Sequence, residues 1–453
     1  MESSLAPFGT PSDDGIRPGG FLEALGNRSF RYLWVAQAIS QIAQNATIFV
    51  LLVLVERETH SSFYTGLLLL SALLPTVLFG MAAGVFVDRW PKRRILVTTN
   101  LLRVLAVMLF LFFPTVLPLI FLVSFAFGTI SQFFAPAEMA TVPSVVERRQ
   151  LIAANGLFNL TFSASQLLGF ILVGPAAVKS LGLHGTFVLL AVGFAIAAVL
   201  VRLLPELSPA ASPRLNVTSV ALNIWHELIE GVAFLRRDSL LLLAIGQMTV
   251  IGALLLAVGT LAPGYAARVV GASASDAFIL FGPAGVGIIA GIVVIPRLSG
   301  RLAPHLLPPI GLFVSAGSLL LMALAGLARP DQFASGVWVP ILWSAVLAGA
   351  AGVGIGYALV NVPAQTLVQT RVPEALWGRV FATQVVLGHF TALLPLVALG
   401  HVADRVGIPW VAGAISAGLF VAWLVSWRWA QMRVAAAETQ LSDVDRAIRA
   451  SLE

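Results

Sequence analysis

The chain has 453 residues, of which 58% are hydrophobic and only 11% are charged, and its mean hydropathy is +0.93. A water-soluble domain carries roughly a quarter charged residues, so this composition excludes a soluble globular protein and indicates that much of the surface faces lipid. The chain contains no cysteine. That excludes disulfides, a cysteine nucleophile and thiolate metal sites.

Twelve apolar runs of membrane-spanning length follow one another along the chain. Inside a bilayer the backbone must satisfy its own hydrogen bonds, so such runs form helices or the strands of a closed barrel. They are continuous and about twice the length of a barrel strand, so we predict an all-α membrane protein with twelve transmembrane helices. The runs cover residues 33–55, 64–86, 95–113, 119–135, 151–174, 184–204, 239–261, 276–296, 305–327, 337–360, 379–401 and 408–429.

The net charge of +6 does not require a nucleic-acid partner. If both termini are cytoplasmic, 22 of the 27 Lys and Arg residues fall in cytoplasmic segments or beside them. This asymmetry follows the positive-inside rule, and it predicts cytoplasmic N- and C-termini. The basic residues expected on the opposite side are Arg57, Lys179, Arg268, Arg329 and Arg405.

Polar interruptions divide the chain into two six-helix halves. We expect a cytoplasmic tail over 1–30, an N-terminal bundle over 31–204 and a C-terminal bundle over 239–430. Between the bundles, the proline-rich stretch 205–238 predicts a cytoplasmic linker that ends in a helix lying on the membrane surface. Residues 431–453 form a cytoplasmic C-terminal tail. The N-terminus has no signal-peptide layout.

The two halves contain related stretches after their fourth helix. At a constant offset of 227 residues, Pro136 pairs with Pro363 and Glu147 with Glu374. Two bundles repeated about an axis along the membrane normal are typical of a transporter with its substrate site between the halves.

A turn between the second and third runs carries the most specific motif. The stretch GVFVDRWPKRR matches G-x-x-x-D-R-x-x-[RK]-[RK] at Gly84, Asp88, Arg89, Lys92 and Arg93. With twelve helices and a central linker, it resembles the major facilitator superfamily. The resemblance implies that these latch residues hold helix two against helix eleven when the cytoplasmic side is closed. Plain positive-inside anchoring is the alternative, which we favour for Lys92 and Arg93.

Three further stretches point to one branch of that superfamily. They are FRYLWVAQAISQ at the first helix, PAEMATVP after the fourth and NVPAQTLVQTRVPEALWGRV after the tenth. They resemble exporters that include macrolide-efflux and siderophore-efflux permeases.

Polar residues within the predicted helices are candidates for a substrate cavity between the halves, because lipid does not tolerate them. Those of the first helix share one face, as do those of the fifth. The alternative is that their amides hydrogen-bond neighbouring helices together. The candidates are Gln37, Gln41, Gln44, Asn45, Asn155, Asn159, Ser163, Gln166, Gln247, Gln384 and Thr391.

Proton coupling has three candidates. No Asp or Glu falls in the middle of a predicted span, and His389 is the titratable side chain clearly inside one. Imidazole titrates near physiological pH, although a structural role for His389 is slightly favoured. Arg103 either snorkels to the cytoplasmic surface or pairs with Glu138 or Asp88.

We therefore predict a plasma-membrane exporter of hydrophobic small molecules that works by alternating access and exchanges with protons. A lysophospholipid flippase or uncoupled facilitator is one alternative, and a non-transporting membrane sensor is another. The sequence has no HExxH, GxSxG or P-loop motif, so neither an enzyme nor ATP drive is supported. We expect no cofactor or metal, a monomeric chain, and membrane lipids and a lipophilic substrate as partners.

Overall fold

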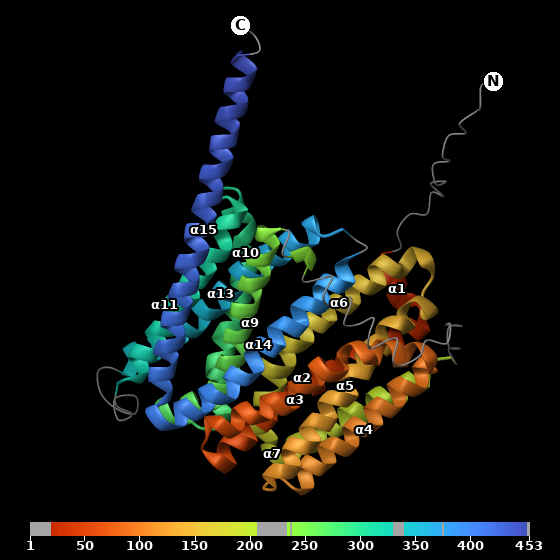
Figure 1. Cartoon of the computed structure of the whole chain (residues 1–453). Helices are drawn as coiled ribbons and strands as arrows, with labels where there is room; N and C mark the ends of the chain where they lie inside the picture. The colour runs from red at the N-terminus through yellow and green to blue at the C-terminus, as the bar shows by residue number, and fades with distance from the viewer. Residues whose placement is uncertain (1–19, 206–232, 236–237, 329–338, 374–375, 451–453) are drawn as a thin grey trace, which may run out of the picture.

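The computed structural model describes residues 20–205, 233–235, 238–328, 339–373 and 376–450. These residues form helices and contain no strand (Figure 1). The helices are α1 (Phe21–Gly26), α2 (Arg28–Thr59), α3 (Ser62–Arg89), α4 (Lys92–Phe112), α5 (Leu117–Val145), α6 (Leu151–Leu167), α7 (Gly174–Arg202), α9 (Ser239–Gly264), α10 (Phe278–Ser299), α11 (Leu307–Gly326), α13 (Val339–Arg371), α14 (Trp377–Val406) and α15 (Ile408–Ala450). The π-helical segments η2 (Leu168–Val173) and η3 (Tyr265–Val269) continue α6 and α9, and the short η4 (Ala274–Ala277) precedes α10.

Ten helical stretches among the described residues are long and apolar enough to cross a membrane. The stretch 151–202 covers two of the predicted runs. Gly182 interrupts it with φ +67°, a conformation that glycine adopts without steric cost. Helix α14 coincides with the predicted run 379–401 and is not among the ten. The all-α class is confirmed, whereas the number of twelve and the side of the termini stay predictions.

The described helices pack as two groups. In the N-terminal group α7 packs against α2 and α4, and α5 packs against α3 and α4. In the C-terminal group α13 packs against α10 and α11, α11 against α15, and α14 against α9. Helix α3 of the first group packs along α14 of the second, and Figure 1 shows both crossing the middle of the molecule.

The predicted boundaries are only partly visible. The first 19 residues of the N-terminal tail and most of the linker, including its surface helix, lie outside the described residues. Helix α15 runs for 43 residues without a break and projects beyond the bundle (Figure 1). Residues 431–450 continue this helix, and their place on the cytoplasmic side stays a prediction.

Polar side chains cap the N-termini of two of the helices. Asn27 Oδ1 accepts hydrogen bonds from the backbone N–H groups of Ser29 and Phe30 and so caps α2. Asp238 accepts from the N–H of Leu240 and caps α9. Asn and Asp are preferred at this position because they satisfy N–H groups that have no partner within the helix.

Glycines allow α10 and α13 to approach at backbone contact. A Cβ atom on Gly354 would overlap the carbonyl oxygen of Ala284, and one on Gly287 would overlap that of Ala351. Small residues at such a crossing are the usual means of close packing between membrane helices.

We expect Gly354→Ala to lower the thermal stability of the purified protein. The added methyl group has to push two backbones apart, and overpacking of this kind costs about 1–3 kcal/mol. Gly252→Ala in α9 is the matched control, because nothing lies within 4 Å of its Cβ position. Alanine is the better helix former, so the control should be neutral or slightly stabilising. Equal melting temperatures for the two variants in detergent would contradict this close contact.

Candidate transport pathway and its gate

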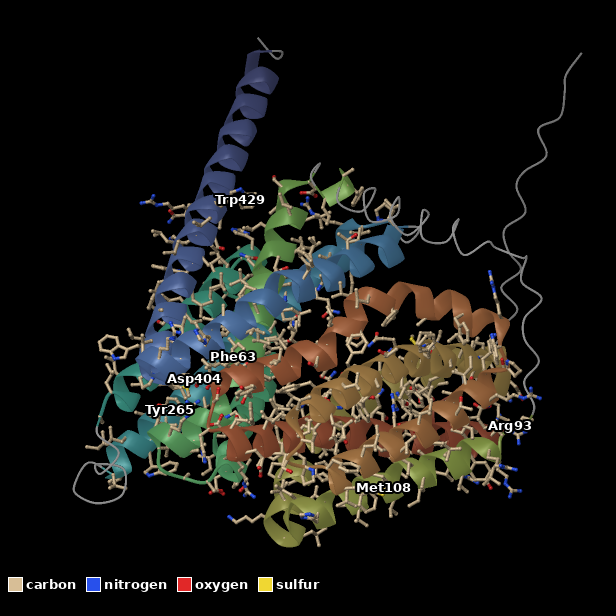
Figure 2. All side chains as sticks on the ribbon, turned by 60° about the horizontal axis from the view of Figure 1, so that its bottom comes forward. Phe63, Arg93, Met108, Tyr265, Asp404 and Trp429 are labelled. Carbon is tan, nitrogen blue, oxygen red and sulfur yellow. The ribbon has the colours of Figure 1, made fainter. Side chains whose placement is uncertain are left out.

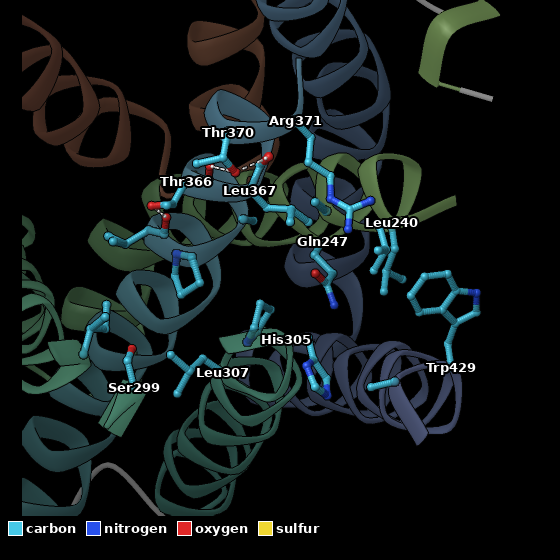
Figure 3. Close-up of a pocket in the computed structure, with 18 residues that line it drawn as sticks. Leu240, Gln247, Ser299, His305, Leu307, Thr366, Leu367, Thr370, Arg371 and Trp429 are labelled. Carbon is cyan, nitrogen blue, oxygen red and sulfur yellow. Dashed lines mark hydrogen bonds between the residues drawn. The ribbon is translucent and has the colours of Figure 1, made fainter. Parts of the chain in front are cut away.

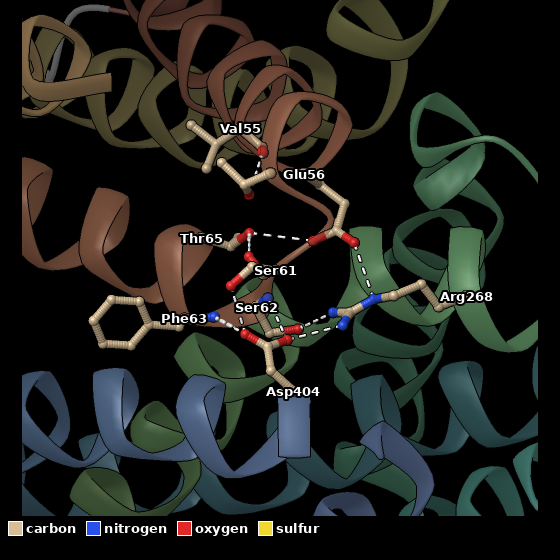
Figure 4. Close-up of polar contacts among 9 residues, drawn as sticks. Val55, Glu56, Ser61, Ser62, Phe63, Thr65, Arg268 and Asp404 are labelled. Carbon is tan, nitrogen blue, oxygen red and sulfur yellow. Dashed lines mark hydrogen bonds and ion pairs between the residues drawn. The ribbon is translucent and has the colours of Figure 1, made fainter. Parts of the chain in front are cut away.

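An ion-pair gate of Glu56, Arg268 and Asp404 joins the two halves at one end of the molecule (Figure 4). Glu56 lies in the last turn of α2, Arg268 in η3 and Asp404 near the end of α14. Arg268 Nε lies 3.1 Å from Glu56 Oε1, and Arg268 Nη1 lies 2.8 Å from Asp404 Oδ1. The Glu56 side chain is 0% exposed, against 27% for Arg268 and 22% for Asp404. A buried carboxylate of this kind needs its counter-charge.

Asp404 also binds the start of α3. Its carboxylate accepts from the backbone N–H of Ser62 at 2.8 Å and of Phe63 at 3.0 Å, and from the hydroxyl of Ser61. The N-terminus of a helix favours an anion because its N–H groups are unpaired and its dipole is positive there. Arg268 Nη2 donates to Ser62 Oγ as well. The Asp404 carboxylate thus binds both the Arg268 guanidinium and the N-terminus of α3.

Two weaker contacts support the gate at the same end. Arg57 Nη2 donates to Ser275 Oγ at 2.7 Å, and Lys179 Nζ lies 4.0 Å from Asp276 Oδ1. Both contacts connect the N-terminal half to η4. They are exposed, and exposed ion pairs stabilise by little, so the buried Glu56–Arg268 pair is the stronger link.

An aromatic layer lies next to the gate along α2. Phe49, two turns before Glu56, packs edge-on against Phe170 of η2 and Phe281 of α10. The rings of Phe170 and Phe281 are 4.7 Å apart at 80°, the edge-to-face arrangement that aromatic pairs prefer. Two rings from the N-terminal half and one from the C-terminal half therefore pack together between the bundles, two turns of α2 away from the ion pairs.

Helices α3 and α14 touch at the gate end and separate toward the other end. A Cβ on Gly66 would lie 3.0 Å from the carbonyl oxygen of Leu396, and one on Gly400 would overlap that of Ser62. At Gly84 and Gly388, farther from the gate, nothing lies within 4 Å of the Cβ position. In Figure 2, Arg93 and Trp429 lie at the far ends of the two halves, away from Asp404 and from each other.

The predicted polar stripe of the fifth helix lies on an exposed face of α6. Asn155, Asn159, Ser163 and Gln166 are all exposed, whereas Ala153 and Ala154 on the opposite face are buried. Four polar side chains on one exposed face of an apolar helix need water or a polar ligand, because lipid offers no hydrogen bonds. This face is the best candidate for a wet wall of the pathway.

The stripe predicted on the first helix has a different role in this structure. Gln37 is buried and donates to the carbonyl oxygen of Phe158 at 3.3 Å, so it joins α2 to α6. Gln41 is buried, and its backbone carbonyl oxygen accepts from the side chain of Asn45 in the same helix. Gln44 is bound to Arg103. Gln37 and Gln44 therefore join α2 to neighbouring helices, where a wall open to the cavity was expected.

The remaining cavity candidates are scattered. Gln247 is buried in α9 and lines a cavity within the C-terminal half. Gln384 is half-buried in α14, and its Oε1 accepts no hydrogen bond from any residue that the structure describes. Thr391 is exposed and donates to the carbonyl oxygen of Leu387 in its own helix. The structure does not bring Gln247 together with the stripe on α6.

A buried polar cluster surrounds Arg103 in the N-terminal half. Arg103 is 1% exposed, so it does not snorkel to the surface. Its Nη1 donates to Ser40 Oγ at 2.8 Å, and its Nη2 donates to Gln44 Oε1 at 2.9 Å and Ser131 Oγ at 3.1 Å. The guanidinium carbon lies 4.3 Å from the ring centre of Phe134, a favourable cation–π distance. The cluster connects α2, α4 and α5.

Glu138 lies near this cluster without a direct ion pair. It is buried in α5, and its Oε1 has no hydrogen-bond partner among the described residues. The charge of Arg103 acts on it, although no nitrogen of Arg103 comes within 4.0 Å of its carboxylate among the ion pairs of the described residues. An unsatisfied buried carboxyl group is costly, and such groups concentrate at functional sites.

The structure describes the latch residues in part. Asp88 lies in the last turn of α3, and its side chain is outside the described residues, as is that of His389. Arg89 is exposed, Lys92 is buried at the start of α4 and Arg93 is half-buried. Among the described residues, no atom lies within 4 Å of a Cβ placed on Gly84.

A second ion pair lies at the end opposite the gate. Arg371 Nη1 is 3.0 Å from Asp238 Oδ2, which joins α13 to the start of α9. Partial burial alone would raise the pKa of Asp238, but hydrogen bonds from Arg371 and from the N–H of Leu240 outweigh it and lower that pKa. Asp238 therefore stays ionised, and the pair carries no net charge.

Sequence reasoning missed the ion-pair gate. The charge count places Arg268 on the outer side and gives it no further role. The available signal was that Glu56, Arg268 and Asp404 are charged residues at the edges of predicted spans. Their pairing depends on the packing of distant segments, which no local pattern encodes.

Two helical bundles that meet along α3 and α14 are an architecture common among membrane transporters. Residues 33–394 match the model of the Major Facilitator Superfamily. The chain belongs to this superfamily, so it is a multi-pass membrane transporter and not an enzyme.

Several relatives share low but extended similarity. The chain is 26% identical over 393 residues to the uncharacterized MFS-type transporter YkuC of Bacillus subtilis, which covers 82% of this chain and 86% of YkuC. It is 25% identical over 397 residues to the enterobactin exporter EntS of Citrobacter koseri, covering 85% of this chain and 88% of EntS. Macrolide efflux protein A of Streptococcus pyogenes is 27% identical over 219 residues, 46% of this chain and 51% of that protein. The predicted resemblance to exporters is confirmed at this level.

A solved structure agrees with the fold. The nucleoside transporter NupG superposes with a TM-score of 0.65 at 12% identity, covering 88% of this chain and 98% of NupG. At this identity the likeness concerns the fold alone.

Proposed function

We propose that the protein exports uncharged lipophilic small molecules across the inner membrane by alternating access. The polar stripe on α6 carries this proposal, because it offers hydrogen bonds on an exposed face of an otherwise apolar helix. The similarity to EntS and to macrolide efflux protein A supports the direction of transport. With the orientation expected from the positive-inside rule, the closed gate faces outward and the structure is an inward-facing state.

Ser163→Trp should block transport. An indole on the exposed face of α6 fills the pathway, and we expect Nile red, an uncharged lipophilic dye, to leave cells at least about tenfold more slowly, the equivalent of ~1.4 kcal/mol. The assay uses a bacterial strain without its own drug-efflux pumps. Ile196→Trp, at an exposed apolar position of α7, is the matched control and should transport like the parent chain. Efflux no faster than in cells with an empty vector would contradict the proposed function.

Protons are the coupling ion that we propose, with Glu138 as their carrier. This rests on the buried carboxyl oxygen without a partner and on the nearby charge of Arg103. In weakly buffered detergent solution, adding Nile red should release protons from the parent protein and not from Glu138→Gln, as read with a pH dye. Dye binding without proton release between pH 6 and 8 would favour an uncoupled facilitator or a lipid flippase.

A further inference from the structure

A cavity of about 680 Å³ lies inside the C-terminal half, apart from the pathway between the halves (Figure 3). Helices α9, α10, α11, α13 and α15 line it, and none of the described lining residues comes from the N-terminal half. It lies at the helix ends opposite the ion-pair gate, near Ser299, Arg371 and Trp429. Its volume falls in the range of sites that bind drug-sized molecules.

One buried polar side chain in this cavity has no partner. Gln247 is 5% exposed, and among the described residues its amide makes no hydrogen bond. Figure 3 shows its amide pointing into the cavity toward His305. The buried side-chain atoms without a partner do not include those of Gln247, so its amide borders the cavity, where water can hydrogen-bond to it. A ligand with a suitable polar group can take the place of that water.

The rest of the lining selects against a charged ligand. The walls are mostly aliphatic, with Leu243, Leu307 and Leu367 among them, and no Asp or Glu is part of the described lining. Arg371 at the edge is already paired with Asp238 at 3.0 Å. An organic cation would meet no counter-charge in this lining, and an anion would compete with Asp238 for Arg371. Burying an unpaired charge is far more costly than burying a neutral polar group.

We propose that this cavity is a second ligand site, which binds an uncharged lipophilic molecule through a hydrogen bond from its carbonyl, amide or hydroxyl group to Gln247. The site differs from the pathway in its helices and in its position. Binding there does not depend on whether the protein transports the same molecule.

The absence of cysteine from the chain allows a direct test. Thr366→Cys places one thiol on the exposed cavity wall, and its alkylation by N-ethylmaleimide is followed by mass spectrometry in purified protein. Nile red, which carries a carbonyl group, should slow the reaction at least about tenfold at saturation, as expected when a ligand covers the site. The cation ethidium should protect much less. A separate Ser163→Cys chain reports on the pathway, so failure of one site is distinguished from failure of the other.

Gln247→Met tests the hydrogen bond. It removes the amide with little change in volume, and we expect protection to require about tenfold more Nile red, which equals ~1.4 kcal/mol. Gln37→Met is the matched control, a buried glutamine that bonds to a backbone carbonyl outside the cavity. Gln247→Asn keeps a shorter amide and should retain more protection than Gln247→Met. Absence of protection, equal protection by ethidium, or no effect of Gln247→Met in folded protein would overturn the proposal.

Discussion

Replacing Arg268 by glutamine should open the ion-pair gate and expose the pathway to the outside. The change leaves Glu56, which is fully buried, without its counter-charge. Removing one partner of a buried pair costs about 3–5 kcal/mol. A cost of ~3 kcal/mol changes the equilibrium constant between the closed and the open gate roughly a hundredfold. The measurement is the reaction of Ser163→Cys, as the single thiol of the chain, with a membrane-impermeant maleimide added to intact cells.

We expect that reaction to be at least about tenfold faster with Arg268→Gln than without it. Arg57→Gln serves as the control, because it removes one exposed hydrogen bond to Ser275 and should change the rate little. Adding Glu56→Gln to Arg268→Gln removes the uncompensated charge and should slow the reaction again. If Arg268→Gln left the thiol as protected as in the parent chain, these residues would not form the gate.

Replacing Arg103 by methionine should strongly destabilise the N-terminal half. The guanidinium holds Ser40, Gln44 and Ser131 together, and its charge acts on the nearby carboxyl group of Glu138. Methionine fills part of the volume and satisfies none of these groups, so we expect a loss of about 1–3 kcal/mol for each polar group left unpaired. The melting temperature of the purified protein in detergent measures it.

Glu138→Gln should restore part of the stability lost in Arg103→Met, since the two residues act on each other. The double variant is therefore expected to melt above the Arg103→Met single variant. Arg94→Met, at an exposed position at the start of α4, is the control and should melt like the parent chain. Strictly additive effects of the two substitutions would show that Arg103 and Glu138 are not coupled.

Local patterns in the sequence were sufficient for the helices and for part of the pathway. Hydrophobic runs of membrane length predicted the positions of the helices, because hydropathy depends only on neighbouring residues. Helical spacing likewise placed Asn155, Asn159, Ser163 and Gln166 on one face, which the structure shows exposed. Such patterns report on a single helix and its environment.

Such local patterns did not predict contacts between segments that are far apart in the sequence. The side chains of Ser61 and Asp404 meet although 343 positions separate them, and nothing in either local sequence indicates this. The four polar residues of the first helix also share one face, yet Gln37 and Gln44 hydrogen-bond within the bundle because α6 and Arg103 pack against that face. Equal spacing on two helices thus led to different roles.

The most direct test of alternating access measures both ends of the molecule at once. Pairs of spin labels are placed on introduced cysteines, with Glu58 and Val406 reporting on the gate end and Arg94 and Arg297 on the opposite end, all of them exposed. Double electron–electron resonance gives both distances in the parent chain and in Arg268→Gln. The account predicts that the substitution lengthens the distance at the gate end and shortens the one at the opposite end. Distances that stay constant, or that change in the same direction at both ends, would contradict it.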